Sequence, residues 1–398
     1  MRALLLVLDG VGIGHAADAA SYGDEGANTL GHILEQLPEL ELPNLHSLGL
    51  REILGGTCFR TSLSLADLSE KSGHAEARPS EKKYRASYGC MQERSAGKDT
   101  TTGHWEIAGV ILDEPFAIYE RFPEELVSAI EHAADVHFLG NYARSGTTIL
   151  GELGTEHCRT GKPILYTSAD SVLQIAAHED VVSNERLYEI CRIARREADK
   201  FRIGRVIARP FAGTLGKFVR TSRRHDFSML PPRTILDALR KENISVTGVG
   251  KISDIFAGQG INASYPTASN REGMERITTL WSARGDGLIF INLVDFDMLY
   301  GHRRDVLGYG RALEEFDRWL GRFLPAVEPH DLVIITADHG NDPTYRGTDH
   351  TREQVPLFVL HGNETGNLGT RKTFADVAAS LAQFFELSNT WPTGSSFL

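Results

Sequence analysis

Residues 3–14 read Ala-Leu-Leu-Leu-Val-Leu-Asp-Gly-Val-Gly-Ile-Gly, a short apolar run that ends at an aspartate and a glycine-rich turn. Such a run, bounded by turn residues, is typical of a strand that is buried on both faces. It is too short for the core of a secretion signal and far too short to span a membrane. Similar apolar runs recur at residues 244–249, 288–294, 332–336 and 355–360. The sequence therefore predicts several buried strands distributed along the chain.

Helical patterns separate these apolar runs. The clearest lies in residues 311–324, where apolar residues recur at spacings of three and four: Leu313, Phe316, Leu320 and Phe323. Residues 271–283 and 373–385 show a similar pattern. Alternating strands and helices predict an α/β fold, in which a mostly parallel sheet is covered by helices on both faces.

The length of 398 residues favours two domains, and the middle of the chain differs in character from the rest. This middle part has its own helical pattern at 185–200, short strand candidates at 164–166 and 205–207, and many arginines. We therefore expect a smaller α/β domain at residues 115–232, inserted into a larger domain that is formed by residues 1–114 and 233–398. Residues 62–87 are polar and without periodicity, which predicts a long loop.

The amino-acid composition limits which classes of partner and which cell compartment can be expected for this protein. The formal net charge of −11 argues against a nucleic-acid-binding protein, because such proteins normally have a basic face. No segment resembles a targeting signal or a membrane span, so we expect no membrane association. The four cysteines are scattered and form no C-x-x-C pair, which predicts reduced thiols in a cytoplasmic protein: Cys58, Cys90, Cys158 and Cys191. The sequence leaves the oligomeric state open.

Acidic and imidazole side chains follow the predicted strands. Three aspartates come after apolar runs and three histidines lie near them: Asp9, Asp297, Asp338, His302, His339 and His350. Because the carboxyl ends of the strands form the ligand crevice of an open α/β sheet, we expect these side chains to converge. Such a set can hold two divalent ions roughly 3.5–4 Å apart, which stabilise the entering and leaving oxygens of an in-line displacement. Mixed oxygen and nitrogen ligands suit manganese, zinc or iron better than calcium.

Each of these residues also has an ordinary structural explanation. An aspartate after a strand is usually a turn or cap residue, and a single histidine is usually a surface or core residue. The segment Asp338-His-Gly-Asn341 can be read as a tight turn and nothing more. Six such residues together are much harder to explain in this way, and the set favours a two-metal site.

A second segment, Gly97-Lys-Asp-Thr-Thr-Thr-Gly-His-Trp-Glu106, places hydroxyl groups before a predicted helix. A hydroxyl there can be a nucleophile whose phosphate is held by backbone N–H groups. The alternative is that the threonines are helix caps. Spacing alone does not choose among Thr100, Thr101 and Thr102. Three aspartates and two divalent ions leave a net charge of about +1, which a phosphothreonine of about −1.5 to −2 would offset.

At this point four segments resemble the phosphopentomutase family of the alkaline phosphatase superfamily. They are Asp9-Gly-Val-Gly-Ile-Gly14, Gly97–Glu106, Asn292-Leu-Val-Asp-Phe-Asp297 with Gly301-His-Arg-Arg-Asp305, and Asp338-His-Gly-Asn-Asp-Pro343 with Thr348-Asp-His-Thr-Arg-Glu353. The likeness continues through the middle of the chain, where residues 166–174 and 205–211 look like the family's cap. Thr101 departs from the pattern, since the family often has an apolar residue there, and the polar stretch 62–87 is longer than usual.

The resemblance implies an alkaline-phosphatase-like core with an inserted cap, and an isomerase that interconverts ribose 1-phosphate and ribose 5-phosphate or their 2-deoxyribose equivalents. It implies a phosphorylated Thr100, a ribose 1,5-bisphosphate intermediate, and a sugar bisphosphate such as glucose 1,6-bisphosphate as activator. It also implies two Mn²⁺ ions, the first held by Asp9, Asp338 and His339 and the second by Asp297, His302 and His350, with Asp9 able to contact both. The substrate contacts that it suggests are Lys98, Arg209, Arg220 and Lys251 for phosphate, and Ser168 and Asp170 for the sugar.

Two other functions share part of this pattern. Other enzymes of the superfamily, such as a phosphatase, a phosphodiesterase or a metal-dependent phosphoglycerate mutase, would keep the metal residues. The Gly97–Thr100 segment and the cap segments favour the pentomutase. A protein that only binds sugar phosphates around structural metals is a third reading, and the complete set of six ligands with a nearby threonine counts against it.

Overall fold

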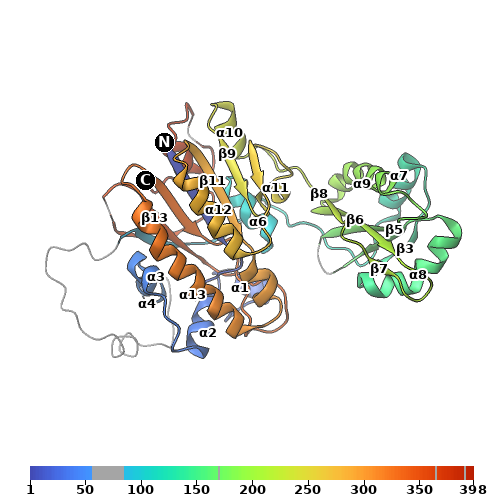
Figure 1. Ribbon diagram of the computed structural model, residues 1–398, viewed down its shortest axis with the longest axis horizontal. Helices are drawn as coiled ribbons and strands as arrows, with labels where there is room; N and C mark the ends of the chain where they lie inside the picture. The colour runs from blue at the N-terminus through green and yellow to red at the C-terminus, as the bar shows by residue number, and fades with distance from the viewer. Residues whose placement is uncertain (56–84, 169–170, 364, 390) are drawn as a thin grey trace. The chain divides into compact units, whose positions relative to one another are not determined.

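The computed structural model describes residues 1–55, 85–168, 171–363, 365–389 and 391–398. The chain divides into two compact units (Figure 1). The core unit comprises Met1–Asp113 and Pro231–Leu398, and the inserted unit comprises Glu114–Leu230. Asp170, Cys58 and most of the polar stretch 62–87 lie outside the described residues.

An eight-stranded sheet forms the centre of the core unit, in the order β10-β9-β11-β1-β12-β13-β2-β14. The strands are β1 (Arg2–Leu8), β2 (Ser87–Met91), β9 (Val246–Val249), β10 (Ala263–Tyr265), β11 (Gly287–Leu293), β12 (Leu332–Thr336), β13 (Val355–Leu360) and β14 (Asn367–Arg371). Only β13 runs antiparallel to its neighbours within this described sheet, and every other pairing is parallel. The predicted mostly parallel sheet is therefore confirmed.

Strand β1 lies between β11 and β12, parallel to both. All of its residues are buried, as expected for a strand with helices on both faces. Its last residues pair with Leu293 of β11 and Thr336 of β12. Since the three strands are parallel, the segments that follow them leave the sheet at the same edge.

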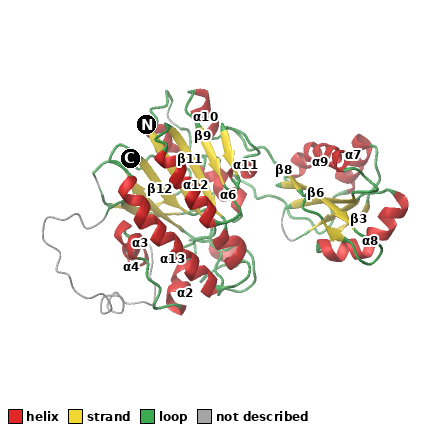
Figure 2. Cartoon of the chain, viewed as in Figure 1, coloured by secondary structure: helices red, strands yellow, loops and turns green. Residues whose placement is uncertain are grey.

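The helices of the core unit cover both faces of this sheet (Figure 2). They are α1 (Ala19–Tyr22), α2 (Thr29–Gln36), α3 (Pro43–Leu48), α4 (Leu50–Gly55), α6 (Thr100–Ile107), α10 (Ile235–Lys241), α11 (Ile252–Ile255), α12 (Asn270–Ser282), α13 (Val306–Phe323) and α14 (Asp376–Phe384). On β11, Phe290 packs against His104 of α6 and Phe256 after α11. Its neighbour Ile291 lies instead beside Gly273 of α12. Because successive strand residues point to opposite faces, α6 and α12 lie on opposite sides of the sheet.

The inserted unit has its own six-stranded sheet. Its elements are α7 (Glu124–Ala134), β3 (Leu139–Ala143), α8 (Gly146–Thr160), β4 (Ile164–Thr167), β5 (Val172–His178), α9 (Asn184–Ala198), β6 (Arg205–Ala212), β7 (Val219–Arg220) and β8 (His225–Ser228). Helices α7 and α9 pack on the face that carries Leu173 and Ile175 of β5. Helix α8 packs on the other face, which carries Ala176. Each face of this small sheet therefore has its own apolar core.

Two features of the described residues bear on the expected compartment and partners. Cys90, Cys158 and Cys191 form no disulfide within the described part of the chain. Among the helices that the structure describes, none combines the length and the apolar character needed to cross a membrane.

Candidate functional site

The three aspartates predicted to bind metal lie together at the carboxyl edge of the core sheet. Asp9 directly follows β1, and Asp338 lies two residues beyond the end of β12. Asp297 lies in a π-helical turn, Phe296–Gly301, that follows β11 and ends at His302. All three carboxylates are buried. The irregular turn after β11 is what brings Asp297 and His302 toward the same edge.

Asp9, Asp338 and His339 form one group of potential metal ligands. His339 Nε2 lies 3.3 Å from Asp9 Oδ1 and 3.3 Å from Asp338 Oδ2. The other ring nitrogen of His339, Nδ1, lies 3.1 Å from the carbonyl oxygen of Gly340, where it can donate a hydrogen bond. A metal-bound histidine usually donates its second nitrogen in this way, which leaves Nε2 with a lone pair for the ion.

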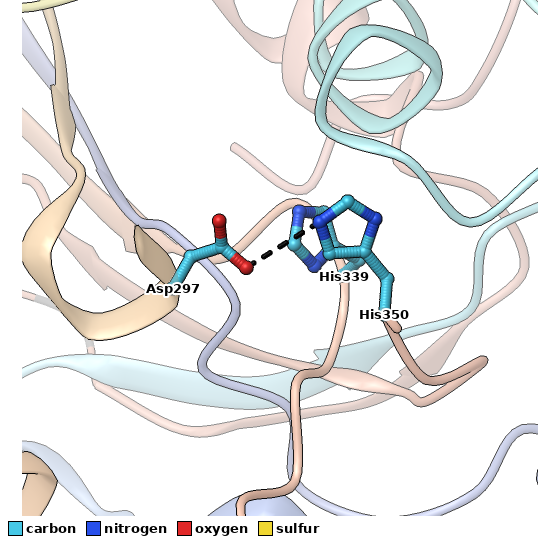
Figure 3. Close-up of side chains that lie close together, drawn as sticks. All are labelled: Asp297, His339 and His350. Atoms are coloured by element: carbon cyan, nitrogen blue, oxygen red, sulfur yellow. Dashed lines mark ion pairs between the residues drawn. The ribbon is translucent and has the colours of Figure 1, made fainter. Parts of the chain in front are cut away.

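Asp297, His339 and His350 form a second group (Figure 3). His350 Nε2 lies 3.4 Å from Asp297 Oδ1, and His302 Nε2 lies 3.4 Å from Asp297 Oδ2. His302 Nδ1 faces the carbonyl oxygen of Thr348 at 2.6 Å, so its Nε2 is also directed at the carboxylate. His302 is not a member of this group but lies next to it, because its Nε2 faces the carboxylate of Asp297. His339 belongs to both groups.

The electrostatic environment of the cluster favours bound positive charge. Asp9 Oδ1 and Asp338 Oδ2 are buried, and imidazole nitrogens are their nearest partners: His339 Nε2 lies 3.3 Å from each, and His104 Nδ1 lies 3.0 Å from Asp338 Oδ2. Neither oxygen has a well-aligned hydrogen bond among the described residues, which is costly for a charged oxygen. Burial, together with the charges of Asp338 and Asp297, raises the pKa of Asp9. Burial lowers the pKa of His339, but the surrounding carboxylates outweigh it and raise that pKa well above its ordinary value. An electrostatic field that favours the protonated forms of these residues also favours divalent cations, because metal ions and protons compete for the same ligand atoms. The residues present therefore fit metal ions.

The hydroxyl of Thr100 faces this cluster. Thr100 begins helix α6, and its Oγ1 lies 3.1 Å from His339 Nε2. Thr102 instead donates its hydroxyl to the carboxylate of Asp99, the N-cap residue. Asp99 also accepts the backbone N–H groups of Thr101 and Thr102. Those two amides are thus engaged with Asp99, and a phosphate on Thr100 needs its positive charge from other groups.

Helix α6 approaches the cluster closely because Gly103 has no side chain. A Cβ at this position would lie 2.1 Å from the carbonyl oxygen of Asp338.

We expect Gly103→Ala to displace Asp338 or α6, to destabilise the core unit by about 1–3 kcal/mol, and to lower metal content. The matched control is Gly151→Ala in α8, where a Cβ meets nothing within 4 Å. That change should stabilise its helix, by up to about 1 kcal/mol. Thermal unfolding and elemental analysis measure both, and wild-type values for Gly103→Ala would contradict the prediction.

Three further polar residues contact the candidate metal ligands or Thr100, and the sequence analysis assigned them no role. The side-chain amide of Asn292 lies 3.1 Å from Asp9 Oδ2 and 3.1 Å from His104 Nε2. His104 Nδ1 in turn lies 2.9 Å from the carbonyl oxygen of Thr100. Asn341 donates its amide to Asp297 Oδ1 at 2.6 Å. All three residues lie within the motifs quoted above, so their position in those motifs was the available signal.

The predicted substrate contacts lie in both units. In the core unit, Lys98 Nζ lies 2.9 Å from Asp24 Oδ2 and 3.5 Å from Asp349 Oδ2. Lys251 is the N-cap residue of α11 and is half-buried.

Ser168, Arg209 and Arg220 lie near one another in the inserted unit. Arg209 Nε donates to Gln174 Oε1 at 3.0 Å, and Gln174 Nε2 donates to Ser168 Oγ at 3.5 Å. Burial and the charges of Arg224 and Arg220 lower the pKa of Arg209, although Tyr166 opposes them. The inserted unit therefore carries a cluster of positive charge beside polar oxygens, which suits a phosphorylated sugar.

Known proteins resemble this chain over its full length. Residues 1–389 match the model of the Metalloenzyme superfamily. The phosphopentomutase of Syntrophotalea carbinolica is 52% identical, with 100% of this chain and 97% of the relative covered. Those of Acetivibrio thermocellus and Dictyoglomus turgidum are each 50% identical, with 100% of this chain and 98% and 97% of the relatives covered. A metal-ligand cluster at the sheet edge, a matching superfamily model and full-length relatives at this identity together assign the chain to the phosphopentomutase family of the Metalloenzyme superfamily.

Proposed function

We propose that this phosphopentomutase interconverts ribose 1-phosphate and ribose 5-phosphate, and their 2-deoxyribose equivalents, through a phosphorylated Thr100. The observation that carries the proposal is the 3.1 Å contact between Thr100 Oγ1 and His339 Nε2, the ring nitrogen that faces Asp9 and Asp338. A metal ion held there would lower the pKa of the hydroxyl, so Thr100 could accept and return a phosphoryl group without a separate base.

In this proposal the six predicted ligands hold two manganese ions. Asp9, Asp338 and His339 would hold the ion nearer to Thr100, and Asp297, His302 and His350 would hold the other. Bound divalent ions supply charge neutralisation for the oxygens between which the phosphoryl group moves. The carboxylates and imidazoles suit manganese, and the unsatisfied oxygens of Asp9 and Asp338 support the assignment of these residues as ligands.

The reaction proceeds in two transfers. Phosphothreonine at position 100 gives its phosphoryl group to the free hydroxyl of a pentose monophosphate: the new P–O bond forms to the sugar, the bond to Thr100 Oγ1 breaks, and the hydroxyl proton passes to the threonine oxygen. The resulting ribose 1,5-bisphosphate turns and returns its other phosphoryl group to Thr100. A sugar bisphosphate such as glucose 1,6-bisphosphate restores the phosphorylated enzyme when Thr100 has lost its phosphate.

The inserted unit acts as the cap that selects the acceptor. Water at about 55 M competes with the sugar hydroxyl, so the enzyme must exclude water and hold the sugar during transfer. Ser168 and Asp170 are proposed to hold the sugar. Arg209 and Arg220 are proposed to hold the distal phosphate in the inserted unit, and Lys98 and Lys251 serve phosphate in the core unit. The cluster around Arg209 supports this role.

Weaker binding of the sugar phosphate by the inserted unit should change the ratio of phosphoryl transfer to hydrolysis. We expect Arg209→Ala and Asp170→Ala to slow transfer to pentose phosphate more than they slow loss of phosphate to water. The measurement is the ratio of mutase turnover to phosphate release. Arg159→Ala, on the exposed surface of α8, is the control and should keep the wild-type ratio. A wild-type ratio in both test variants would show that Arg209 and Asp170 do not govern acceptor choice.

A coupled assay tests the proposed function. Ribose 1-phosphate should convert to ribose 5-phosphate in the presence of Mn²⁺ and a catalytic amount of glucose 1,6-bisphosphate, and should require both after the enzyme is stripped of metal and phosphate. Phosphate release without isomerisation, under the same conditions, would indicate a phosphatase and contradict the proposal. We also propose a cytoplasmic location, the compartment that the scattered cysteines of the sequence predict.

A further inference from the structure

Arg352 is a buried arginine that lies two residues after His350. Its side chain is only 2% exposed, and all three guanidinium nitrogens donate hydrogen bonds. Nε and NH2 donate hydrogen bonds to the carboxylate of Asp18 at 3.1 and 2.9 Å, and NH1 donates to Glu93 Oε2 at 2.6 Å. Burying a charge is costly unless every donor has a partner, and Arg352 meets this condition.

The remaining donors of Arg352 bind the backbone that leads into Thr100. NH1, whose two N–H groups also serve Glu93 Oε2, lies 2.9 Å from the carbonyl oxygen of Ser95 and 2.5 Å from that of Gly97, so three acceptors share its two N–H groups. NH2 donates its second N–H to the carbonyl oxygen of Glu93 at 2.7 Å. Three carbonyl groups of one short segment are thus held by one side chain. Gly97 in turn lies against Thr102 of α6, where an added Cβ would come within 2.8 Å of the threonine hydroxyl oxygen. The segment therefore has little room to move independently of Arg352 and α6.

The main chain of Arg352 makes a second connection to the same segment. Its N–H donates to Asp24 Oδ2 at 2.9 Å, and the same oxygen accepts Lys98 Nζ at 2.9 Å. Lys98 lies two residues before Thr100. Side chain and backbone of Arg352 thus both tie the Thr100 segment to the segment that carries His350.

We infer that Arg352 is a positioning residue, which fixes the segment from Glu93 to Thr100 against the His350 segment and so sets the placement of the Thr100 hydroxyl relative to the metal ligands. The inference rests on the proposed role of Thr100. Only arginine fits this task, because a planar fork with five N–H groups can bind two carboxylates and several carbonyls at once. A lysine at this position keeps the charge and has one nitrogen, which cannot reach the same set of acceptors.

The test compares Arg352→Lys with Arg2→Lys. Arg2 is also buried and binds a carboxylate through two nitrogens, those facing Asp331, but it lies at the opposite end of β1 from Asp9. A misplacement of about 1 Å commonly costs about a hundredfold in rate. We therefore expect Arg352→Lys to lower kcat for ribose 1-phosphate about a hundredfold, with KM within twofold and metal content unchanged. Arg2→Lys should lower the unfolding temperature and leave kcat near the wild-type value.

Several outcomes would overturn the inference. Wild-type kcat in a folded Arg352→Lys variant would do so, as would a kcat loss that only parallels a loss of metal. If Arg352→Lys does not fold, Asp18→Ala removes one carboxylate partner, whose side chain is 49% exposed, and should lower kcat roughly tenfold at constant KM. Wild-type kcat in that variant would reject the inference. Wild-type enzyme that shows neither turnover nor labelling of Thr100 would reject the proposed function as well.

Discussion

Thr100→Ala is expected to abolish both mutase turnover and labelling of the protein by a phosphorylated sugar primer. The variant has no oxygen at the position that faces His339 Nε2, so the phosphoryl group has no carrier on the enzyme. Metal content and the unfolding temperature should stay close to wild type, because Thr100 belongs to neither ligand group and its neighbour Asp99 still caps α6. The measurements are turnover with ribose 1-phosphate, incorporation of labelled phosphate, and elemental analysis.

Thr101→Ala provides the matched control. Thr101 contributes its backbone N–H to Asp99, and alanine retains that group. This variant should be labelled and should turn over. Persistent labelling of Thr100→Ala, or a labelled peptide in the wild type that maps to Thr101 or Thr102, would show that another hydroxyl carries the phosphate.

His339→Ala should have the largest effect among the histidine variants. His339 Nε2 lies 3.1 Å from Thr100 Oγ1 and 3.3 Å from carboxylate oxygens of both Asp9 and Asp338, whereas His350 and His302 face Asp297. Metal contributions to transition-state stabilisation amount to several kcal/mol, so we expect His339→Ala to lower kcat at least roughly 10³-fold. Its metal content should also fall from about two ions per chain toward one. His302→Ala and His350→Ala should each lower the metal content from about two ions per chain toward one.

Elemental analysis of protein equilibrated with Mn²⁺ distinguishes these cases, and thermal unfolding shows whether the fold survives. Unchanged stoichiometry in His302→Ala or His350→Ala would remove that residue from the ligand set. Wild-type kcat and wild-type metal content in His339→Ala would remove His339 from the set in the same way.

Sequence patterns predicted the centre of the core fold well. The apolar runs at 288–294, 332–336 and 355–360 correspond to β11, β12 and β13, because strands buried on both faces must be apolar throughout. Helix α13 begins at Val306, earlier than its apolar pattern predicts, since Asp305 caps it by accepting the N–H of Gly308. Strand β2 was not predicted. Its sequence, Ser-Tyr-Gly-Cys-Met, has no continuous apolar run, and it is a strand because β13 and β14 pair with it.

The candidate site was predictable to the level of residue type. Aspartates and histidines after buried strands are a local signal, and five of the six named residues lie in two groups that could hold a metal ion, while His302 lies beside Asp297. Their role as ligands stays a prediction. Spacing could not choose among the three threonines, because it does not show which hydroxyl faces the cluster: Thr102 donates to Asp99, and Thr100 lies beside His339. The role of Arg352 could not be predicted from the sequence, for a related reason. Its partners at Glu93 and Gly97 are distant in sequence, and only the packed chain brings them together.

The central place of β1 in the sheet has a consequence for biosynthesis. Both neighbours of β1 come late in the chain, at Gly287–Leu293 and Leu332–Thr336. At translation rates of about 5–20 residues per second, this apolar strand emerges on the order of 15–60 s before its first partner exists. Unpaired apolar strands aggregate readily, so we expect the nascent chain to depend on chaperones that cover β1. The candidate metal ligands cannot come together until that cover is released, because Asp338 and His339 follow the last of the three strands to be made.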